Sequence, residues 1–291
     1  MKDPLTILIA GCGDVGGLLG VKLALQGHRV WGMLRNPSRL PPGLLPLEAD
    51  LNEQGLAAKL PQSLDFVFFT AAASRHDEAG YRETYLLGLD RLLTALKERG
   101  MKQIRRVFFT SSTGVYGQTD GSWVDEASPT EPQGFSGKAM LEAERLLFDS
   151  GFPACAVRFG GIYGPGRTRL LSLAAAGALC APSPPLYTNR IHREDCAGVL
   201  LHLMGLTDLD ELYLAVDDEP AAKYDVLFWL AAQIGAPPPK AGAAAPTSKG
   251  SSPNKRCANR KLKATGFRFR YPSFREGYRE LADAFQGPFS G

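Results

Sequence analysis

The amino-acid sequence predicts an α/β fold in which helices cover both faces of a doubly wound parallel sheet. Three observations lead to this prediction. Short apolar segments alternate with helix-like segments through the first part of the chain. Most of the short segments are apolar at every position, which is typical of strands that are buried on both faces of a parallel sheet. A glycine-rich turn joins the first of these strands to the first helix.

The strands of this sheet are expected where short apolar runs occur, at residues 5–11, 28–35, 44–51, 64–72, 104–112 and 153–160. Apolar residues at helical spacing predict one helix over residues 13–27 and a second over residues 84–100. Gly27 and Gly100 mark their ends. A third helix is expected to contain Lys138 near its start.

The pattern changes after about Ile162, where a loop, a helix and a proline-rich turn follow one another. A further strand is expected at residues 209–216. Residues 236–256 are rich in Ala, Pro, Gly and Ser, which predicts a mobile surface loop. The second part of the chain is therefore expected to form a smaller lobe, built from pieces that are not contiguous in the sequence.

The composition of the 291 residues is that of an ordinary globular protein, with 44% hydrophobic and 22% charged residues. A net charge of +3 is too weak to indicate binding to nucleic acid or to a membrane surface. The cysteines form no C-x-x-C pair and the histidines show no metal-ligand spacing. We therefore expect buried free thiols and no metal site. The N-terminal residues do not resemble a secretory signal, so a cytoplasmic protein is expected.

Gly11, Gly13 and Gly16 form a G-x-G-x-x-G pattern between the first strand and the first helix. The first glycine allows a tight turn, the second lets the backbone approach a pyrophosphate, and the third lets the helix pack closely on the strand. Backbone N–H groups at the helix start, around Asp14 and Val15, then attract the phosphates. The pattern predicts the dinucleotide site of a Rossmann fold, although such glycines also serve plain turns.

The end of the second strand is expected to select the dinucleotide. An acidic residue there would bind the ribose of NAD, but this chain has Arg35, followed by Asn36 and Arg39. An arginine suits the 2′-phosphate of NADP, so NADP is expected and NAD remains possible; a solvated surface arginine is the alternative. The other cofactor contacts are expected after the third and fourth strands, at Asp50, Leu51, Ala71 and Ala72. Asp50 also fits a plain loop position.

Five motifs, in order, carry a resemblance to a known family: GCGDVG, FFTSSTGVYG, KAMLEAE, VRFGGIYGPGR and RIHREDCAGVL. With them the chain resembles the extended or atypical short-chain dehydrogenase/reductases, of the NAD-dependent epimerase/dehydratase-like group. The resemblance implies an NAD(P)-binding Rossmann domain at residues 1–162. It also implies a small C-terminal α/β lobe, mainly residues 163–291, that binds substrate and returns some segments to the core sheet.

The resemblance implies that Ser112 is the catalytic hydroxyl, with Ser111 as the near alternative, and that Lys138 binds the nicotinamide ribose. In the family a tyrosine four residues before the lysine exchanges the proton. Here that position is Gly134, and Phe135 beside it carries no proton. The chain therefore departs from the family at its central acid/base group.

Another tyrosine is a candidate for this missing role. Tyr85 stands three residues before Gly88, where a similar helix of the family carries an asparagine close to the catalytic centre. We expect Tyr85 to be a replacement proton donor, with an aromatic packing role as the alternative. Further phenols considered for the site are Tyr81, Tyr116 and Tyr163.

Basic residues of the second part of the chain point to an anionic substrate. Arginine binds phosphate or carboxylate oxygens in pairs. The substrate-binding residues are expected to be Tyr163, Arg167, Arg190 and His192. The alternatives are loop packing for Tyr163 and solvated surface charge for the arginines. Asp195 is expected to support the first turn of a helix.

The function expected from these features is that of an NAD(P)-dependent oxidoreductase or epimerase/dehydratase-like enzyme. Its substrate would be small and anionic, or linked to a nucleotide. The alternative is a non-catalytic NADP-binding sensor or regulatory protein. A homodimer is possible, because the family often dimerises through helices of this kind; neither a nucleic-acid nor a membrane partner is expected.

Overall fold

The computed structural model describes residues 3–242 and 253–285. The chain divides into two compact units. The first unit contains Met1–Val115, Pro132–Arg158 and Ala197–Tyr213. The second contains Tyr116–Glu131, Phe159–Cys196 and Leu214–Gly291. The chain thus passes back and forth between the units. The assignment of the cofactor to residues 1–162 and of the substrate to residues 163–291 remains a prediction.

A seven-stranded sheet forms the centre of the first unit, in the order β11-β7-β5-β4-β1-β2-β3. The pairings of β1 with β2, β2 with β3, β1 with β4 and β4 with β5 are parallel. Each strand lies within a segment predicted as a strand; the bounds are β1 (Thr6–Ala10), β2 (Arg29–Leu34), β3 (Leu45–Glu48), β4 (Phe66–Phe69), β5 (Arg106–Ser112), β7 (Ala154–Phe159) and β11 (Leu212–Ala215). The predicted doubly wound α/β fold is confirmed.

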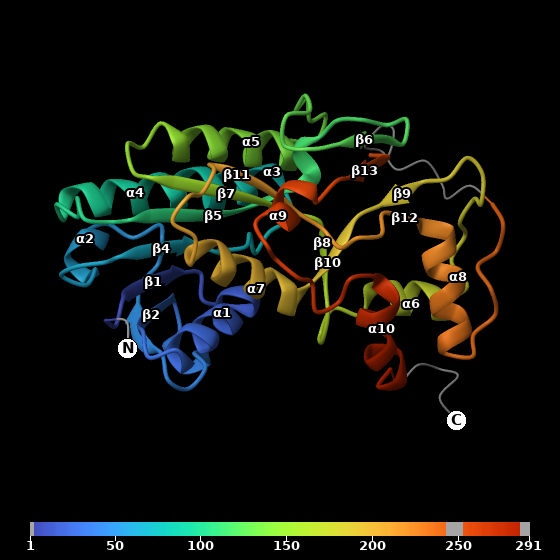
Figure 1. The fold of residues 1–291 in the computed structure, drawn as a ribbon, viewed down its shortest axis with the longest axis horizontal. Helices are drawn as coiled ribbons and strands as arrows, with labels where there is room; N and C mark the ends of the chain where they lie inside the picture. The colour runs from blue at the N-terminus through green and yellow to red at the C-terminus, as the bar shows by residue number, and fades with distance from the viewer. Residues whose placement is uncertain (1–2, 243–252, 286–291) are drawn as a thin grey trace. The chain divides into compact units, whose positions relative to one another are not determined.

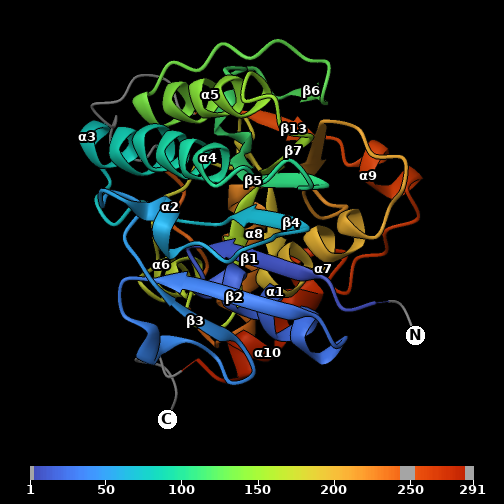
Figure 2. The same ribbon diagram turned by 90° about the vertical axis from the view of Figure 1, so that its left-hand side faces the viewer.

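Helices cover both faces of this sheet, as Figure 2 shows. α4 (Gly88–Glu98) and α5 (Phe135–Phe148) lie on one face. α1 (Asp14–Leu25) and α7 (Arg193–Met204) lie on the other. The predicted helix over residues 84–100 begins earlier, because α3 (Glu78–Tyr81) and a π-helical turn, η2 (Arg82–Leu87), run into α4. A short α2 (Leu56–Lys59) and the 3₁₀ turns η1 (Pro37–Arg39) and η3 (Thr113–Val115) complete the unit.

Aromatic side chains of β4 and β5 fill the core on both faces of the sheet. All four residues of β4 are buried, and its Phe68 stacks on Phe108 of β5 with ring centroids 4.7 Å apart. One position further along, and so on the opposite face of the sheet, Phe69 meets Phe109 with tilted rings whose centroids lie 5.7 Å apart. Such cross-strand aromatic contacts fix the register of β4 against β5. The carboxyl ends of the two strands are therefore held at one edge of the sheet.

The second unit is built from short paired strands and helices (Figure 1). β8 (Gly161–Tyr163) pairs with β10 (Arg190–His192), and β6 (Ser122–Val124) pairs with β13 (Lys255–Cys257), both in parallel. β9 (Tyr187–Thr188) pairs with β12 (Ala221–Ala222) in antiparallel fashion. The helices are α6 (Arg169–Ala175), α8 (Lys223–Gln233), α9 (Arg260–Ala264) and α10 (Phe274–Asp283).

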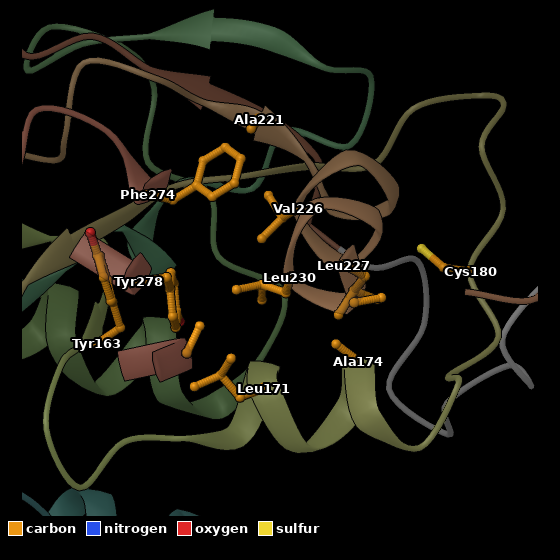
Figure 3. Close-up of a cluster of buried hydrophobic side chains, with 12 residues drawn as sticks. Tyr163, Leu171, Ala174, Cys180, Ala221, Val226, Leu227, Leu230, Phe274 and Tyr278 are labelled. Atoms are coloured by element: carbon orange, nitrogen blue, oxygen red, sulfur yellow. The ribbon is translucent and has the colours of Figure 1, made fainter. Parts of the chain in front are cut away.

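One apolar cluster joins three of these helices (Figure 3). Leu171 of α6, Leu227 and Leu230 of α8, and Phe274 and Tyr278 of α10 are all buried in it. Burying large side chains of this kind contributes about 1.5–3 kcal/mol each. The cluster explains why the second unit is compact although its strands have only two or three residues each.

The loop predicted at residues 236–256 falls partly on residues 243–252, which lie outside the described residues. Its last residues differ from the prediction, because Lys255 and Arg256 belong to β13. All five cysteines are buried thiols, as predicted. None of the helices in residues 3–242 and 253–285 is long and apolar enough to cross a membrane.

Candidate active site

The glycine turn lies where β1 and β4 end, at the point where the strand order of the sheet reverses. Gly11 has a φ of 85°, and a Cβ there would lie 2.3 Å from the Cα of Ala71. A Cβ on Gly16 would lie 2.3 Å from Oγ1 of Thr70 and 2.9 Å from the carbonyl oxygen of Gly11. No larger residue fits at either position without displacing backbone.

Gly13, unlike Gly11 and Gly16, lies in open space. A Cβ built on it would find no atom within 4 Å. Gly13 is the N-cap of α1, a helix of 12 residues. The first N–H groups of such a helix have no partner inside the helix. The hydroxyl of Thr70 donates to the carbonyl oxygen of Gly11 at 2.9 Å and holds the turn in place. The arrangement leaves room for an anion against the backbone.

Arg35 and Arg39 follow β2 and are both exposed. Neither guanidinium has a hydrogen bond or an ion pair with the described residues. Asn36 between them has a structural role, because its Oδ1 accepts from the N–H of Ser38 at 3.1 Å and from the Ser38 hydroxyl at 2.7 Å. It thereby caps η1. The turn therefore presents two unpaired arginines at the end of β2.

The remaining predicted cofactor residues differ in their surroundings. Oδ1 of Asp50 accepts from the N–H of Asn52 at 2.9 Å, which is the local turn of a loop residue. Leu51 is half-buried against Gly88. Ala71 touches the glycine turn and Ala72 is exposed. The residues after β4 thus lie beside the glycine turn.

Burial and hydrogen bonding separate the two serines at the end of β5. Ser111 is buried and its hydroxyl donates to Oε1 of Glu144 at 2.5 Å. Ser112 is only half-buried, and its Oγ accepts from the N–H of Gly114 at 3.0 Å. The Ser112 hydroxyl keeps its own proton for another acceptor. The structure therefore favours Ser112 over Ser111 as the hydroxyl that is available to a ligand.

Lys138 lies in the first turns of α5, where its N–H donates to the carbonyl oxygen of Gly134 at 3.1 Å. Its side chain is exposed, like those of Glu142 and Arg145, which follow at i+4 and i+7 on the same helical face. The resemblance implies a ribose-binding lysine at this position, and Lys138 lies on the face of the helix that is open to solvent. Gly134 is the N-cap of α5 and presents no side chain.

Tyr85 lies in the π-helical turn and is 9% exposed. Its hydroxyl oxygen accepts from the N–H of Ala73, just after β4, at 3.4 Å. Burial raises the pKa of this phenol, and the bond from Ala73 opposes the shift. The Tyr85 ring lies 5.2 Å from that of Tyr81, which in turn lies edge-on to Phe135 at 5.4 Å. Tyr85 is therefore a protonated phenol close to the ends of β4 and β5.

In the second unit, Tyr163 is a core residue. It is 3% exposed and stacks on Tyr278 with ring centroids 4.4 Å apart (Figure 3). It also meets His192 edge-on at 5.2 Å. Its hydroxyl donates to the carbonyl oxygen of Ser273 at 3.4 Å. The contacts favour the packing alternative for Tyr163. Tyr116 is likewise buried, and its hydroxyl donates to the carbonyl oxygen of Asp125 at 2.7 Å.

The other residues predicted to bind substrate fall into two groups. Arg167 is exposed. Arg190 is buried, with its guanidinium 5.3 Å from the Phe274 ring centroid and bonded to the Thr188 hydroxyl. His192 is also buried, and its Nδ1 accepts from the N–H of Glu194 at 3.2 Å. The structure thus gives Arg190 and His192 internal contacts in the second unit.

Sequence reasoning missed a buried charged cluster in the first unit. The guanidinium of Arg158 on β7 donates to Glu144 of α5 through Nε at 2.9 Å and Nη2 at 2.6 Å. Ser111 of β5 completes the cluster. One signal in the sequence could have found it, because Glu144 lies four residues after Met140 and three before Leu147. An acidic residue on an apolar helical face requires a buried partner.

The chain is similar to known proteins along nearly its whole length. The sequence model of the NAD dependent epimerase/dehydratase family matches residues 7–235. A solved structure from Methylobacillus flagellatus, described as a candidate NAD-dependent epimerase/dehydratase, is 35% identical with a TM-score of 0.79, and covers 97% of this chain and 99% of its own.

Two curated relatives are also similar. Protein YeeZ of Escherichia coli K12 is 27% identical over 276 residues, which cover 91% of this chain and 96% of YeeZ. A 3-diazoavenalumate denitrifying reductase of a Streptomyces species is 25% identical, across 93% of this chain and 98% of the reductase. Together with the sheet order and the glycine turn, these similarities show that the chain belongs to the NAD-dependent epimerase/dehydratase family.

Proposed function

We propose that the protein is an NADP-dependent oxidoreductase or epimerase of the short-chain dehydrogenase/reductase type, acting on a small anionic or nucleotide-linked substrate. The observation that carries the proposal is the glycine turn, in which Gly11 and Gly16 are closed by backbone and core atoms while Gly13 is open. A turn that only reversed the chain would need no open position at the start of a helix. A dinucleotide needs one for its pyrophosphate.

The preference for NADP is supported by Arg35 and Arg39, which are exposed at the end of β2. A guanidinium without a protein partner can bind a 2′-phosphate, which a carboxylate would repel. Asn36 shapes the turn between them by capping η1. The same turn would bind NAD with fewer contacts.

The residues of the chain supply orientation and hydrogen bonds. When bound, the nicotinamide supplies the hydride chemistry. The Ser112 hydroxyl donates to the reacting oxygen and stabilises its developing negative charge. Tyr85 holds a proton at neutral pH, as any tyrosine with an ordinary or raised pKa does, and we assign it the role of proton donor. Lys138 is the candidate for the nicotinamide ribose, as the resemblance implies, and its side chain is exposed and so accessible to a ligand.

The chemical class of the substrate rests on two supports. Arg167 offers an exposed guanidinium in the second unit, and such groups bind phosphate or carboxylate. The Streptomyces relative is named as a reductase of 3-diazoavenalumate, which supports a reductive reaction of a small molecule. Substrate binding by Tyr163, Arg190 and His192 would require them to give up internal contacts.

Calorimetric titration with NADPH and with NADH tests the proposal. The Gly13→Ala variant places a methyl group in the open position, so we expect loss of affinity for both dinucleotides with little change in folding stability. The Arg35→Ala variant should lose affinity for NADPH by roughly tenfold to a hundredfold, which corresponds to about 1.4–3 kcal/mol for a charge-assisted contact. Its affinity for NADH should be unchanged.

Gly16→Ala is the matched control for Gly13→Ala. Its Cβ would lie 2.3 Å from Oγ1 of Thr70 and 2.9 Å from a backbone oxygen, so this variant should lose folding stability itself. Normal dinucleotide binding by Gly13→Ala would contradict the assigned site. A different outcome would be saturable binding of NADPH with no turnover of any carbonyl compound or nucleotide sugar in a screen. That result would favour the alternative function, a non-catalytic NADP-binding sensor.

A further inference from the structure

The loops that follow β3 and β4 lie on either side of the glycine turn. In the order β4-β1-β2-β3, three intervals separate β4 from β3, which is about 14 Å at the usual spacing of strands. Between them end β1, followed by the glycine turn, and β2, followed by the turn that carries Arg35. In the proposed function these two turns bind the pyrophosphate and the 2′-phosphate. The loops after β3 and β4 would then flank the adenosine half of the cofactor.

One carboxylate joins both of these loops. Glu83 lies in the π-helical turn η2, and its Oε1 accepts from Nδ2 of Asn52, in the loop after β3, at 3.1 Å. Its Oε2 accepts from Nη2 of Arg75, in the loop after β4, at 3.1 Å. Because each oxygen bonds to a different loop, the position of this one side chain sets the distance between the two loops.

Further hydrogen bonds hold each loop to the same helical segment. Oδ1 of Asn52 accepts from Nη1 of Arg91 in α4. In the other loop, the N–H of Ala73 donates to the hydroxyl of Tyr85, which lies two residues after Glu83, at 3.4 Å. Since η2 continues into α4, both loops are attached to one continuous helix. Neither loop can move away from that helix unless the bond to Glu83 and a second bond break together.

We propose that Glu83 is a positioning residue that prepares the adenosine site by holding the loops after β3 and β4 at a fixed separation. The inference rests on the proposed function, because it needs a dinucleotide at the carboxyl ends of the strands. A carboxylate repels phosphate, so Glu83 acts through Asn52 and Arg75 and not by contact with the ligand. A site that is ordered beforehand binds more tightly, because less conformational freedom is lost on binding.

Calorimetry with NADPH and with adenosine 2′,5′-bisphosphate tests the inference. The second probe carries the adenosine and the 2′-phosphate but no nicotinamide. Glu83→Ala should weaken the binding of both probes by the same factor, roughly threefold to tenfold, because the lost contacts are exposed ones. Glu83→Gln keeps one of the two acceptor oxygens, so its loss of affinity should be intermediate.

Glu78→Ala is the control for removing a negative charge near an anionic ligand. Glu78 lies in α3, just before η2, and its exposed side chain has no hydrogen bond or ion pair with the described residues. Its removal should leave the affinity for both probes unchanged. If Glu83→Ala bound both probes as tightly as Glu78→Ala does, the inference would be overturned and the proposed function would stand. If the unaltered protein bound neither probe, both would be overturned.

A double-mutant cycle shows whether Arg75 acts through Glu83. Arg75→Ala should weaken binding of adenosine 2′,5′-bisphosphate in the unaltered protein and have no further effect in Glu83→Ala. Additive losses would mean that Arg75 contacts the ligand itself, which overturns the inference. If denaturation showed that Glu83→Ala had lost its fold, Glu83→Gln and Arg75→Ala would decide: weaker binding by both supports the inference, and unchanged binding by either overturns it.

Discussion

At the scale of single residues, the hydroxyl groups around the glycine turn and the end of β5 differ in what they can still bind. The Ser111 hydroxyl already donates its proton to a hydrogen bond with Glu144. The Ser112 hydroxyl only accepts, from the N–H of Gly114, and can still donate. Tyr85 accepts a hydrogen bond from Ala73 and also retains its proton. The proposed reaction would depend on these remaining donors, because Gly134 has no side chain to supply one.

The role of Tyr85 can be tested by removing its hydroxyl alone. A phenol is protonated at neutral pH even at its ordinary pKa, and burial raises the pKa of Tyr85 further, so this residue holds a proton that it could donate. We expect Tyr85→Phe to lower turnover by roughly 10²–10⁴-fold while NADPH affinity survives. NADPH absorbance follows turnover on substrates found by screening. Tyr81→Phe is the control, since the two rings are neighbours. Undiminished turnover of Tyr85→Phe would make it a packing residue.

Residue identities alone predicted part of the site. Gly11 and Gly16 could be placed because a G-x-G-x-x-G pattern constrains backbone geometry, which depends little on the rest of the chain. Tyr163 and His192 could not be placed, because a polar aromatic residue looks the same in the sequence whether it lines a pocket or fills a core. Their ring partners, Tyr278 for Tyr163 and Tyr271 for His192, lie far along the chain.

At the scale of elements, α5 depends on the charge cluster of Glu144, Arg158 and Ser111. Both partners of the ion pair are almost fully buried, with side-chain exposures of 2% for Glu144 and 5% for Arg158. Neither charge could stay there without the other. The cluster therefore links the helix to β5 and β7 through directed hydrogen bonds, in addition to apolar packing.

Two glutamates of α5 give a matched comparison of buried and exposed pairs. Glu144→Ala leaves Arg158 buried without its partner, so we expect a loss of about 3–5 kcal/mol of folding stability. Glu142→Ala removes an exposed pair with Arg82 at 3.3 Å and should cost about 0–1 kcal/mol. Chemical denaturation measures both. If both variants lost the same folding stability, the buried cluster would not be what stabilises α5 against the sheet.

The elements of the first unit were predictable because each carries its own signal, either continuous apolar strands or amphipathic helices. The strands of the second unit are too short to show a hydrophobic pattern of their own in the sequence. β9 and β12 have two residues each and exist only through their pairing with each other. The contacts that set the rotation of α5 about its axis could not be predicted either, because Gly137 and Glu144 meet residues of another segment, Gly114 and Ser111.

At the scale of the whole molecule, folding stability should depend on pH through a buried carboxyl group of the second unit. Burial raises the pKa of Asp217 to about 8, against the opposing charge of Arg190. Oδ1 of Asp217 accepts from the N–H of Glu219 at 3.2 Å, while Oδ2 has no partner among the described residues. The folded protein therefore holds this proton more tightly than the unfolded chain does.

The sign of the effect follows from this difference. Between the unfolded pKa of about 3.9 and the folded pKa of about 8, the folded state binds more protons, so stability falls as the pH rises. Above about 8 this contribution stops changing. Asp217→Asn should remove this slope and be the more stable protein at high pH. Denaturation midpoints across this range measure it, and identical pH profiles for both proteins would refute the assignment.

The division of the chain has a consequence for any attempt to cut the molecule apart. Residues Ala197–Tyr213 belong to the first unit although Phe159–Cys196 before them belong to the second. A fragment that stopped after β7 would thus forfeit most of α7 and the sheet-edge strand β11. The first unit is therefore not a fragment that can be cut out of the chain, because its sheet is completed only by residues that follow part of the second unit in the sequence.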